Sequence, residues 1–250
     1  MKITHSTAVI SSLLWLAAIL LSGSTQAGEF VQYSDTIFSL HSGRGYQLPG
    51  DQVNLAKLEN SSRWIGGDFY GWVDFSDLPD HPNNQHTWYG ELSPRFSLSK
   101  IAGMDFDGGL VKDVLIATTW ERGEGGNESF LAGAGVSLDV PGFSFFKTNL
   151  YARKDISRGA GFDDMQLTFA WKYPFSIGES QWFTSIIGDY VFGWGPRARN
   201  FHVIPQVNMD IGKRSGIPNR FFLGLKLDYW SNQFGVKNTN TWTPTNSASA

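Results

Sequence analysis

The sequence predicts an all-β protein, a transmembrane antiparallel β-barrel, and three observations support this fold class. Segments of about ten residues, in which polar and apolar side chains alternate, recur along the chain and are divided by turn signals. The chain of 250 residues is 15% aromatic and contains 28 glycines, yet its mean hydropathy is −0.21. Beyond the N-terminal region it has no run of about eighteen apolar residues that would form a transmembrane helix.

The N-terminal residues have the features of a secretory signal peptide. Lys2 begins a short basic region, residues 8–21 are apolar apart from two serines, and small residues at 25–27 provide a cleavage site. We therefore assign residues 1–27 to a signal peptide and expect the exported chain to begin at Gly28.

Charge and cysteine content exclude several classes of protein. The chain has 20 basic and 23 acidic residues, a formal net charge of −3, and removal of the signal peptide takes away one lysine and leaves −4. A negatively charged chain lacks the basic field that nucleic-acid binding needs. The absence of cysteine argues against a disulfide-stapled extracellular scaffold, so stability must come from size or from closure of the sheet.

Eleven strands are readable from the alternation and the turn signals. Their connections alternate between long ones, at 41–51 and 76–85, and short ones, at 61–62 and 140–144, as in outer-membrane barrels with short periplasmic turns. The connection 99–111 is long although it falls on the short side, and we expect a brief helix or an inward-folded segment there. The predicted strands are 30–40, 52–60, 63–75, 86–98, 112–121, 129–139, 145–155, 164–173, 182–192, 201–211 and 220–230.

Strand 63–75 contains the most informative alternation, because successive side chains of a strand point to opposite faces. One face couples carboxylates to aromatic rings, which suits the lining of a pore. The other face is small or apolar, which suits contact with lipid. The polar face carries Asp68, Tyr70, Trp72 and Asp74, and the apolar face carries Phe69, Gly71, Val73 and Phe75.

Three later strands, 86–98, 164–173 and 201–211, separate polar from apolar positions in the same way. In a soluble sandwich, charged side chains would rarely face the core. Aromatic residues near the strand ends fit the aromatic girdles that membrane barrels place at the two membrane–water interfaces. A soluble periplasmic or secreted β-sandwich that binds a ligand is the alternative to the barrel. The polar positions are Glu91, Ser93, Arg95 and Ser97; Asp164, Gln166, Thr168 and Lys172; and His202, Gln206, Asn208 and Asp210.

The polar face of strands 63–75 and 86–98 is the candidate solute-binding lining. Aromatic rings stack on flat heterocycles, and carboxylates, hydroxyls and a guanidinium group bind sugar hydroxyls and base edges. Such a lining favours neutral, ring-bearing polar solutes over bare ions. A second interpretation is that Glu91 and Arg95 merely pair across the lumen and fill a narrow barrel. The pore-lining candidates are Tyr70, Trp72, Asp74, Glu91, Ser93 and Arg95.

Enzyme motifs are absent from the sequence. It contains no G-x-S-x-G elbow, Walker loop, H-E-x-x-H or paired-cysteine pattern, and we predict no catalytic residue, no metal and no cofactor. A lipid-active barrel enzyme would need Ser and His together on the lipid side, whereas His202 shares the parity of lumen residues. The loop Asp74–His86 contains oxygen and imidazole groups of the kind that bind divalent metals, but we favour a solvated acidic loop.

Several of the same residues form motifs of a known family. Residues 68–74, D-F-Y-G-W-V-D, resemble the D-x-Y-G-Y-x-D strand of the Tsx-type nucleoside-specific channels of Gram-negative outer membranes, a family that includes the OmpK group of phage receptors. Residues 93–100, S-P-R-F-S-L-S-K, are similar to its P-R-F/M-S-I-D segment. Residues 135–141 followed by 149–152 resemble its hairpin that ends in N-x-Y-A. The likeness runs from about residue 53 to 230.

The resemblance implies a monomeric twelve-stranded barrel in the outer membrane of a Gram-negative bacterium, with weak nucleoside sites in a narrow lumen. It also implies contact with lipid and with the barrel assembly machinery, and use as a receptor by phages or toxins. Trp72 stands where the family usually has Tyr, and Ser93 where some members have Glu, so the solute preference is left open. The residues that fall on the matching strands are Tyr70, Trp72, Asp74, Glu91 and Arg95.

The C-terminal segment departs from the family, whose members close the barrel with a last strand that ends in an aromatic residue. Residues 237–250 are mainly Thr, Asn, Ser and Ala. We therefore expect residues 28–236 to form the channel domain and 237–250 to be a disordered or aberrant tail. An eleven-stranded sheet leaves an unpaired edge, which lipid cannot hydrate. A poor twelfth strand at 236–243 is one explanation, and a truncation or frame change near residue 236 is the one that we favour.

Overall fold

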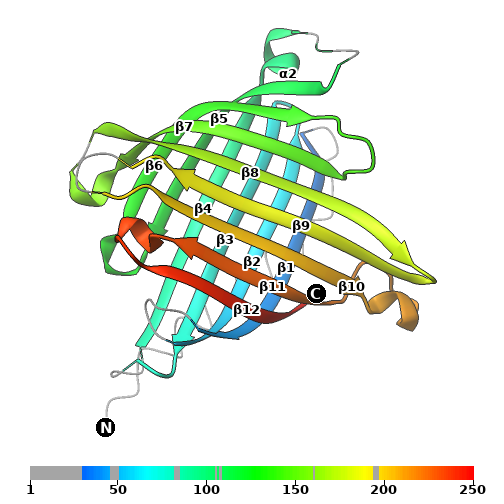
Figure 1. Ribbon diagram of the computed structural model, residues 1–250. Coiled ribbons are helices and arrows are strands. Elements are labelled where there is room, and N and C mark those ends of the chain that lie inside the picture. The colour runs from blue at the N-terminus through cyan, green and yellow to red at the C-terminus, as the bar shows by residue number, and fades with distance from the viewer. Residues whose placement is uncertain are drawn as a thin grey trace.

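Twelve antiparallel strands close into a barrel in the computed structural model, which describes residues 30–45, 51–81, 85–104, 106, 109–159, 161–193 and 197–250 (Figure 1). Each strand pairs with its neighbours in the sequence, and β12 pairs with β1 to close the sheet. The predicted signal peptide lies outside the described residues. The strands are β1 (Val31–Arg44), β2 (Gln52–Trp64), β3 (Gly67–Leu78), β4 (Gln85–Ser97), β5 (Val111–Gly123), β6 (Glu128–Leu138), β7 (Phe145–Asp155), β8 (Phe162–Ile177), β9 (Ser180–Val191), β10 (Asn200–Asp210), β11 (Phe222–Ser231) and β12 (Asn240–Ser249).

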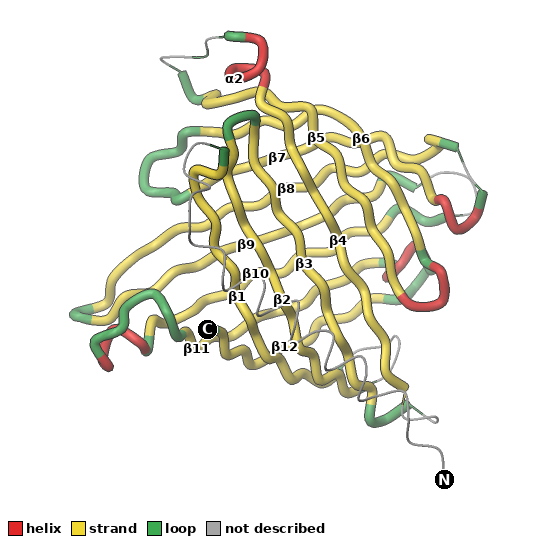
Figure 2. The backbone as a smooth tube through the Cα atoms, turned by 180° about the vertical axis from the view of Figure 1, so that it is seen from behind, coloured by secondary structure: helices red, strands yellow, loops and turns green. Residues whose placement is uncertain are grey.

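The eleven predicted strands correspond in order to β1–β11, and the connections between them contain short helical turns. Helix α2 (Leu98–Ala102) lies beyond the end of β4 (Figure 2), where Ser97 Oγ accepts a hydrogen bond from the Lys100 backbone N–H. This confirms a brief helix in the long connection. The predicted turn at 61–62 lies inside β2 instead, and the chain turns at 65–66. The 3-10 turns are η1 (Glu124–Gly126), η2 (Ile156–Arg158), η3 (Gly212–Ser215) and η4 (Gln233–Gly235).

The twelfth strand corrects the prediction of a disordered or aberrant tail at 237–250. β12 pairs with β11 over ten residues and with β1 over five, from Ser39↔Ser249 to Gly43↔Thr245. Phe38 and Ala250 then exchange two backbone hydrogen bonds of 2.9 Å. The alternation pattern misses this strand because its outward positions include Pro244 and Asn246 rather than a row of apolar residues. The sheet is therefore closed by a segment that the sequence pattern predicted to be a tail outside the barrel.

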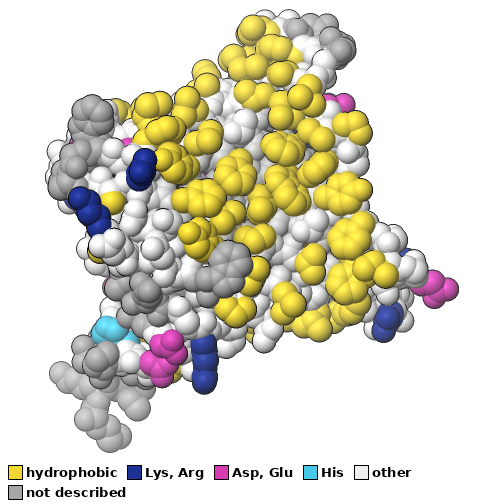
Figure 3. Space-filling view, in the orientation of Figure 1, with side chains coloured by type: hydrophobic (Ala, Val, Ile, Leu, Met, Phe, Trp, Pro, Cys, Tyr) yellow, Lys and Arg dark blue, Asp and Glu magenta, His cyan; other side chains and the backbone are white. Residues whose placement is uncertain are grey.

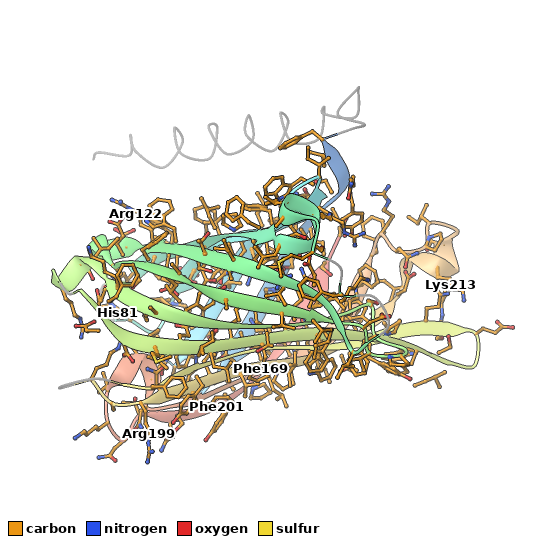
Figure 4. The ribbon with its side chains drawn as sticks, turned by 90° about the horizontal axis from the view of Figure 1, so that it is seen from above. His81, Arg122, Phe169, Arg199, Phe201 and Lys213 are labelled. Carbon is orange, nitrogen blue, oxygen red and sulfur yellow. The ribbon has the colours of Figure 1, made fainter. Side chains whose placement is uncertain are left out.

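The outer surface of the barrel is apolar between two charged ends. Figure 3 shows hydrophobic side chains gathered over the visible strands, with charged groups near the edges. In Figure 4, Phe169 and Phe201 lie between Arg122 and Arg199 at one end and Lys213 at the other. Such a band suits contact with lipid. None of the described helices has both the length and the apolar character that a bilayer crossing needs. Exposed outward side chains include Leu40, Leu92, Ile116, Leu150, Leu167, Leu223 and Leu225.

The interior of the barrel is mostly polar. A small apolar cluster of Ala117, Leu131 and Tyr151 is buried, whereas most other buried side chains are polar or charged, Arg95 and Glu121 among them. A closed sheet with a polar interior and an apolar exterior is the reverse of a soluble sandwich. The sandwich alternative is therefore wrong.

Candidate functional site in the barrel lumen

Arg95 of β4 is the centre of one hydrogen-bonded network in the lumen. Its guanidinium group donates to both carboxylate oxygens of Asp68 on β3, at 2.8 and 2.6 Å. It also donates to Asn149 Oδ1 of β7 at 3.2 Å and to Ser137 Oγ of β6 at 3.1 Å. Lys147 of β7 donates to Asp68 at 3.1 Å. Strands that are not neighbours meet in this way through the interior, so this face of β3 lines the lumen.

Gly135 of β6 makes room for this network. It lies opposite Asn149 in the register, and a Cβ at this position would be only 2.4 Å from Asn149 Oδ1. Arg95 is held by these hydrogen bonds and is 3% exposed. Because its ion pair is with Asp68, the interpretation in which Glu91 pairs with Arg95 is wrong.

A second network surrounds Arg153 of β7. It forms a bidentate pair with Glu121 of β5, at 2.7 and 2.5 Å, and donates to Gln166 Oε1 of β8 at 2.8 Å and to Ser129 Oγ of β6 at 3.0 Å. Gln166 in turn donates to Asp189 of β9 at 3.0 Å. The side chains of Arg153 and Glu121 are 10% and 7% exposed, so the protein rather than water neutralises their charges.

Glu91 of β4 stands among other carboxylates. It lies directly opposite Glu121 in the register and within electrostatic range of Asp189. Lys57 and Arg153 provide positive charge in the same neighbourhood. Like charges directly opposite each other destabilise a sheet, and these two cations offset that cost.

Tyr70, Trp72 and Asp74 of β3 meet two charged residues of β2. Lys57 Nζ lies 4.0 Å from the centroid of the Trp72 ring and 3.8 Å from Asp74 Oδ1. The Tyr70 hydroxyl donates to Glu59 Oε1 at 2.5 Å. We call these five residues the Trp72 cluster. It combines an aromatic face, two carboxylates, a hydroxyl and an ammonium group in one part of the lumen.

Aromatic side chains also pair on the lumen side of the wall. The rings of Trp72 and Tyr89 have centroids 5.5 Å apart and are inclined by 47°. Elsewhere on the wall, His202 of β10 stacks on Trp230 of β11, with a centroid distance of 3.7 Å and an angle of 12°. His202 Nε2 is also 2.9 Å from Asp228 Oδ1. This hydrogen bond and the stacking contact fix the imidazole inside the barrel, where its parity predicted it.

Hydroxyl groups line the wall beside the seam between β12 and β1. The inward side chains of β12 are buried, and Ser39 of β1 is buried next to them. Three of the β12 hydroxyls have no hydrogen-bond partner among the described residues. This wall therefore carries hydroxyl groups rather than paired charges. The inward residues of β12 are Thr241, Thr243, Thr245 and Ser247, and the three without a partner are Thr241, Thr243 and Ser247.

Two of the possible metal ligands, Asp77 near the end of β3 and His86 near the start of β4, face each other in the register. His86 Nδ1 lies 3.3 Å from Asp77 Oδ1, and both side chains are exposed. Across the described residues, which leave out 82–84, no group of three or more His, Cys, Asp or Glu is arranged to hold a metal ion. We therefore propose no metal site at these residues.

The whole barrel matches known proteins. The family described as "Nucleoside-specific channel-forming protein, Tsx" matches residues 36–248, from β1 into β12. The chain belongs to this family. Outer membrane protein OmpK of Vibrio parahaemolyticus serotype O3:K6 (strain RIMD 2210633) is 24% identical over 208 residues, which cover 78% of this chain and 77% of OmpK. Together with the closed barrel, these matches identify an outer-membrane channel of a Gram-negative bacterium, in a family of channel-forming proteins rather than of enzymes.

The lumen of this Tsx-family barrel brings together some predicted residues and separates others. Tyr70, Trp72 and Asp74 share one cluster, whereas Arg95 belongs to the network with Asp68. Ser93 Oγ lies 3.0 Å from Thr119 Oγ1 and is tied into the wall. Several other lumen residues were not among the predicted pore-lining residues. Strand parity carries a signal for them, because they alternate with outward-facing residues. They are Lys57, Glu59, Glu121, Arg153, Asp189, Lys226, Asp228 and Trp230.

Proposed function

We propose that this Tsx-family barrel is a passive channel for small polar solutes and that nucleosides are its favoured class. The observation that carries the proposal is the Trp72 cluster. A nucleoside that displaces the Lys57 ammonium group, which is carried on a flexible stem, offers a flat base to the Trp72 ring and ribose hydroxyls to the carboxylates of Glu59 and Asp74. No chemical step is involved, and the solute moves down its concentration gradient.

The paired charges of the wall favour passage of a neutral solute over that of an ion. Arg95 is neutralised by Asp68, and Arg153 by Glu121, so these groups present hydrogen-bonding atoms more than net charge. Stacking on one aromatic side chain contributes about 1–3 kcal/mol per base. Binding of that strength lets a solute enter and also leave, as conduction requires.

Planar-bilayer recordings test the substrate class. Adenosine should reduce the conductance of the parent channel reversibly, and Trp72→Ala should weaken this block about tenfold, because the stacking surface is lost. Trp171→Ala is the matched control, since Trp171 packs edge-on against Phe143 at 5.5 Å on the outward face. A parent channel that adenosine and uridine leave unblocked would contradict the nucleoside assignment and leave the channel itself intact.

Other features, predicted from the N-terminal residues or implied by the family resemblance, stay predictions. These are cleavage of the signal peptide after Ala27, a monomeric barrel, recognition by the assembly machinery and use as a receptor by phages or toxins. The closed sheet supports a monomer, because it leaves no unpaired strand edge for a second copy.

A further inference from the structure

The Trp72 cluster is arranged to hold a positive charge. Lys57 Nζ lies 4.0 Å from the Trp72 ring centroid, 3.8 Å from Asp74 Oδ1 and 4.0 Å from Glu59 Oε1. An aromatic face attracts a cation through the quadrupole of the ring, and proteins recognise quaternary ammonium groups in aromatic cages. The two carboxylates add charge of the required sign. Lys57 therefore places an ammonium group where a free ammonium ion would also be bound.

The walls of this cage stand at paired positions of two neighbouring strands, whereas the cation is carried at the end of a long side chain. In the register of β2 and β3, Trp72 lies directly opposite Glu59, and Asp74 lies opposite Lys57. The hydrogen bond from Tyr70 holds the Glu59 carboxylate in place. The ammonium group of lysine, in contrast, is carried by a flexible four-carbon stem. We therefore expect the cage to persist when the lysine side chain is replaced.

Asp74 supplies an independent sign that the cage can accept a cation. Its Oδ1 atom is buried and has no hydrogen-bond partner among the described residues. The Lys57 ammonium group, at 3.8 Å, is beyond hydrogen-bond distance. A buried carboxylate oxygen without a hydrogen bond carries a free-energy cost, which a closer cation would reduce.

We propose that Trp72, Glu59 and Asp74 form a binding site for small organic ammonium ions and that Lys57 fills it in the native channel. Lys57 is then the residue that keeps such cations from binding in this part of the lumen. The proposal requires only that solutes enter the lumen, and it holds whether or not nucleosides are among them.

Block of the channel by tetramethylammonium chloride tests this site in planar bilayers. Lys57→Met keeps the approximate length of the side chain and removes its charge. We expect the variant to be half-blocked at a concentration about tenfold lower than the parent, because the tethered ammonium group no longer competes for the ring and both carboxylates. Lys57→Gln is the second variant, and a shift of electrophoretic mobility on heating shows that each variant has folded.

Two matched variants separate the site from a general effect of charge. Lys172→Met removes a lumen lysine of β8 whose ammonium group lies 4.0 Å from the Phe183 ring centroid, away from Glu59 and Asp74, and makes the same change in lumen charge. It should leave the tetramethylammonium block at the level of the parent. The double variant Lys57→Met/Trp72→Leu keeps both carboxylates and should lose the enhanced block.

The proposal is overturned if Lys172→Met enhances the block as much as Lys57→Met does. It is also overturned if the double variant keeps the enhancement, or if the folded Lys57 variants are blocked no more than the parent. Adenosine block, recorded on the same channels, reports the nucleoside assignment separately.

Discussion

The two sides of the lumen are built from different chemistry. From β3 to β9, inward side chains form charged networks that join non-neighbouring strands, around Arg95 and Arg153. At the seam between β12 and β1, the inward side chains of β12 are threonine and serine, and three of their hydroxyls have no partner among the described residues. The seam pairs over five residues, whereas β1 and β2 pair over thirteen. Side-chain pairing thus organises the charged wall, while backbone hydrogen bonds hold the seam.

Removing β12 is the most drastic change to the seam. A chain that ends at residue 239 leaves β1 and β11 with unpaired edges, which lipid cannot hydrate. We expect no folded barrel, and the heat-dependent shift in electrophoretic mobility should disappear. A shortened chain that still shows this shift would mean that the seam is dispensable for closure.

Breaking the ion pair between Arg153 and Glu121 tests the charged wall. Arg153→Met leaves the buried carboxylate of Glu121 without its bidentate partner. We expect the free energy of unfolding to fall by about 3–5 kcal/mol, because an uncompensated buried charge is costly. Urea-induced unfolding in phospholipid vesicles measures the change.

The double variant Arg153→Met/Glu121→Met is the control for this experiment. It removes both charges together, and a buried ion pair replaced by apolar groups is often neutral in stability. The double variant should therefore recover most of the loss. If it is as unstable as the single variant, the ion pair is not the source of the effect.

Two threonine-to-valine substitutions, one on each wall, measure how much a single hydroxyl group contributes to the free energy of unfolding. Thr119 Oγ1 lies 3.0 Å from Ser93 Oγ on the charged wall, and Thr119→Val should lower the free energy of unfolding by about 1 kcal/mol. The Thr243 hydroxyl has no hydrogen-bond partner among the described residues. Thr243→Val should therefore leave stability unchanged or raise it slightly. Equal losses in the same urea assay would contradict the distinction between the two walls.

Strand faces could be predicted from the sequence because the two-residue alternation follows from backbone geometry. The inward positions of Tyr70, Trp72 and Asp74, and of His202, follow from parity alone. The helix α2 could be expected because the connection 99–111 is too long for its side of the barrel.

The partners of the lumen residues could not be predicted in the same way. Arg95 reaches past β5 to Ser137 and Asn149, and the space for it depends on Gly135 in another strand. Such contacts depend on residues far apart in the sequence. The strand β12 could not be predicted for a different reason. Its outward face lacks the row of apolar residues that makes the polar–apolar alternation of a membrane strand visible in the sequence.

The five-residue ladder between β1 and β12 bears on how long the folded barrel lasts. Lateral opening of a barrel breaks one ladder along its length, and in the described sheet this ladder has the fewest paired residues. We therefore expect unfolding to begin at this ladder, between residues 39–43 and 245–249, away from the networks of Arg95 and Arg153. We therefore expect that substitutions in the lumen can change which solutes the channel passes without changing the rate at which the barrel unfolds in the membrane.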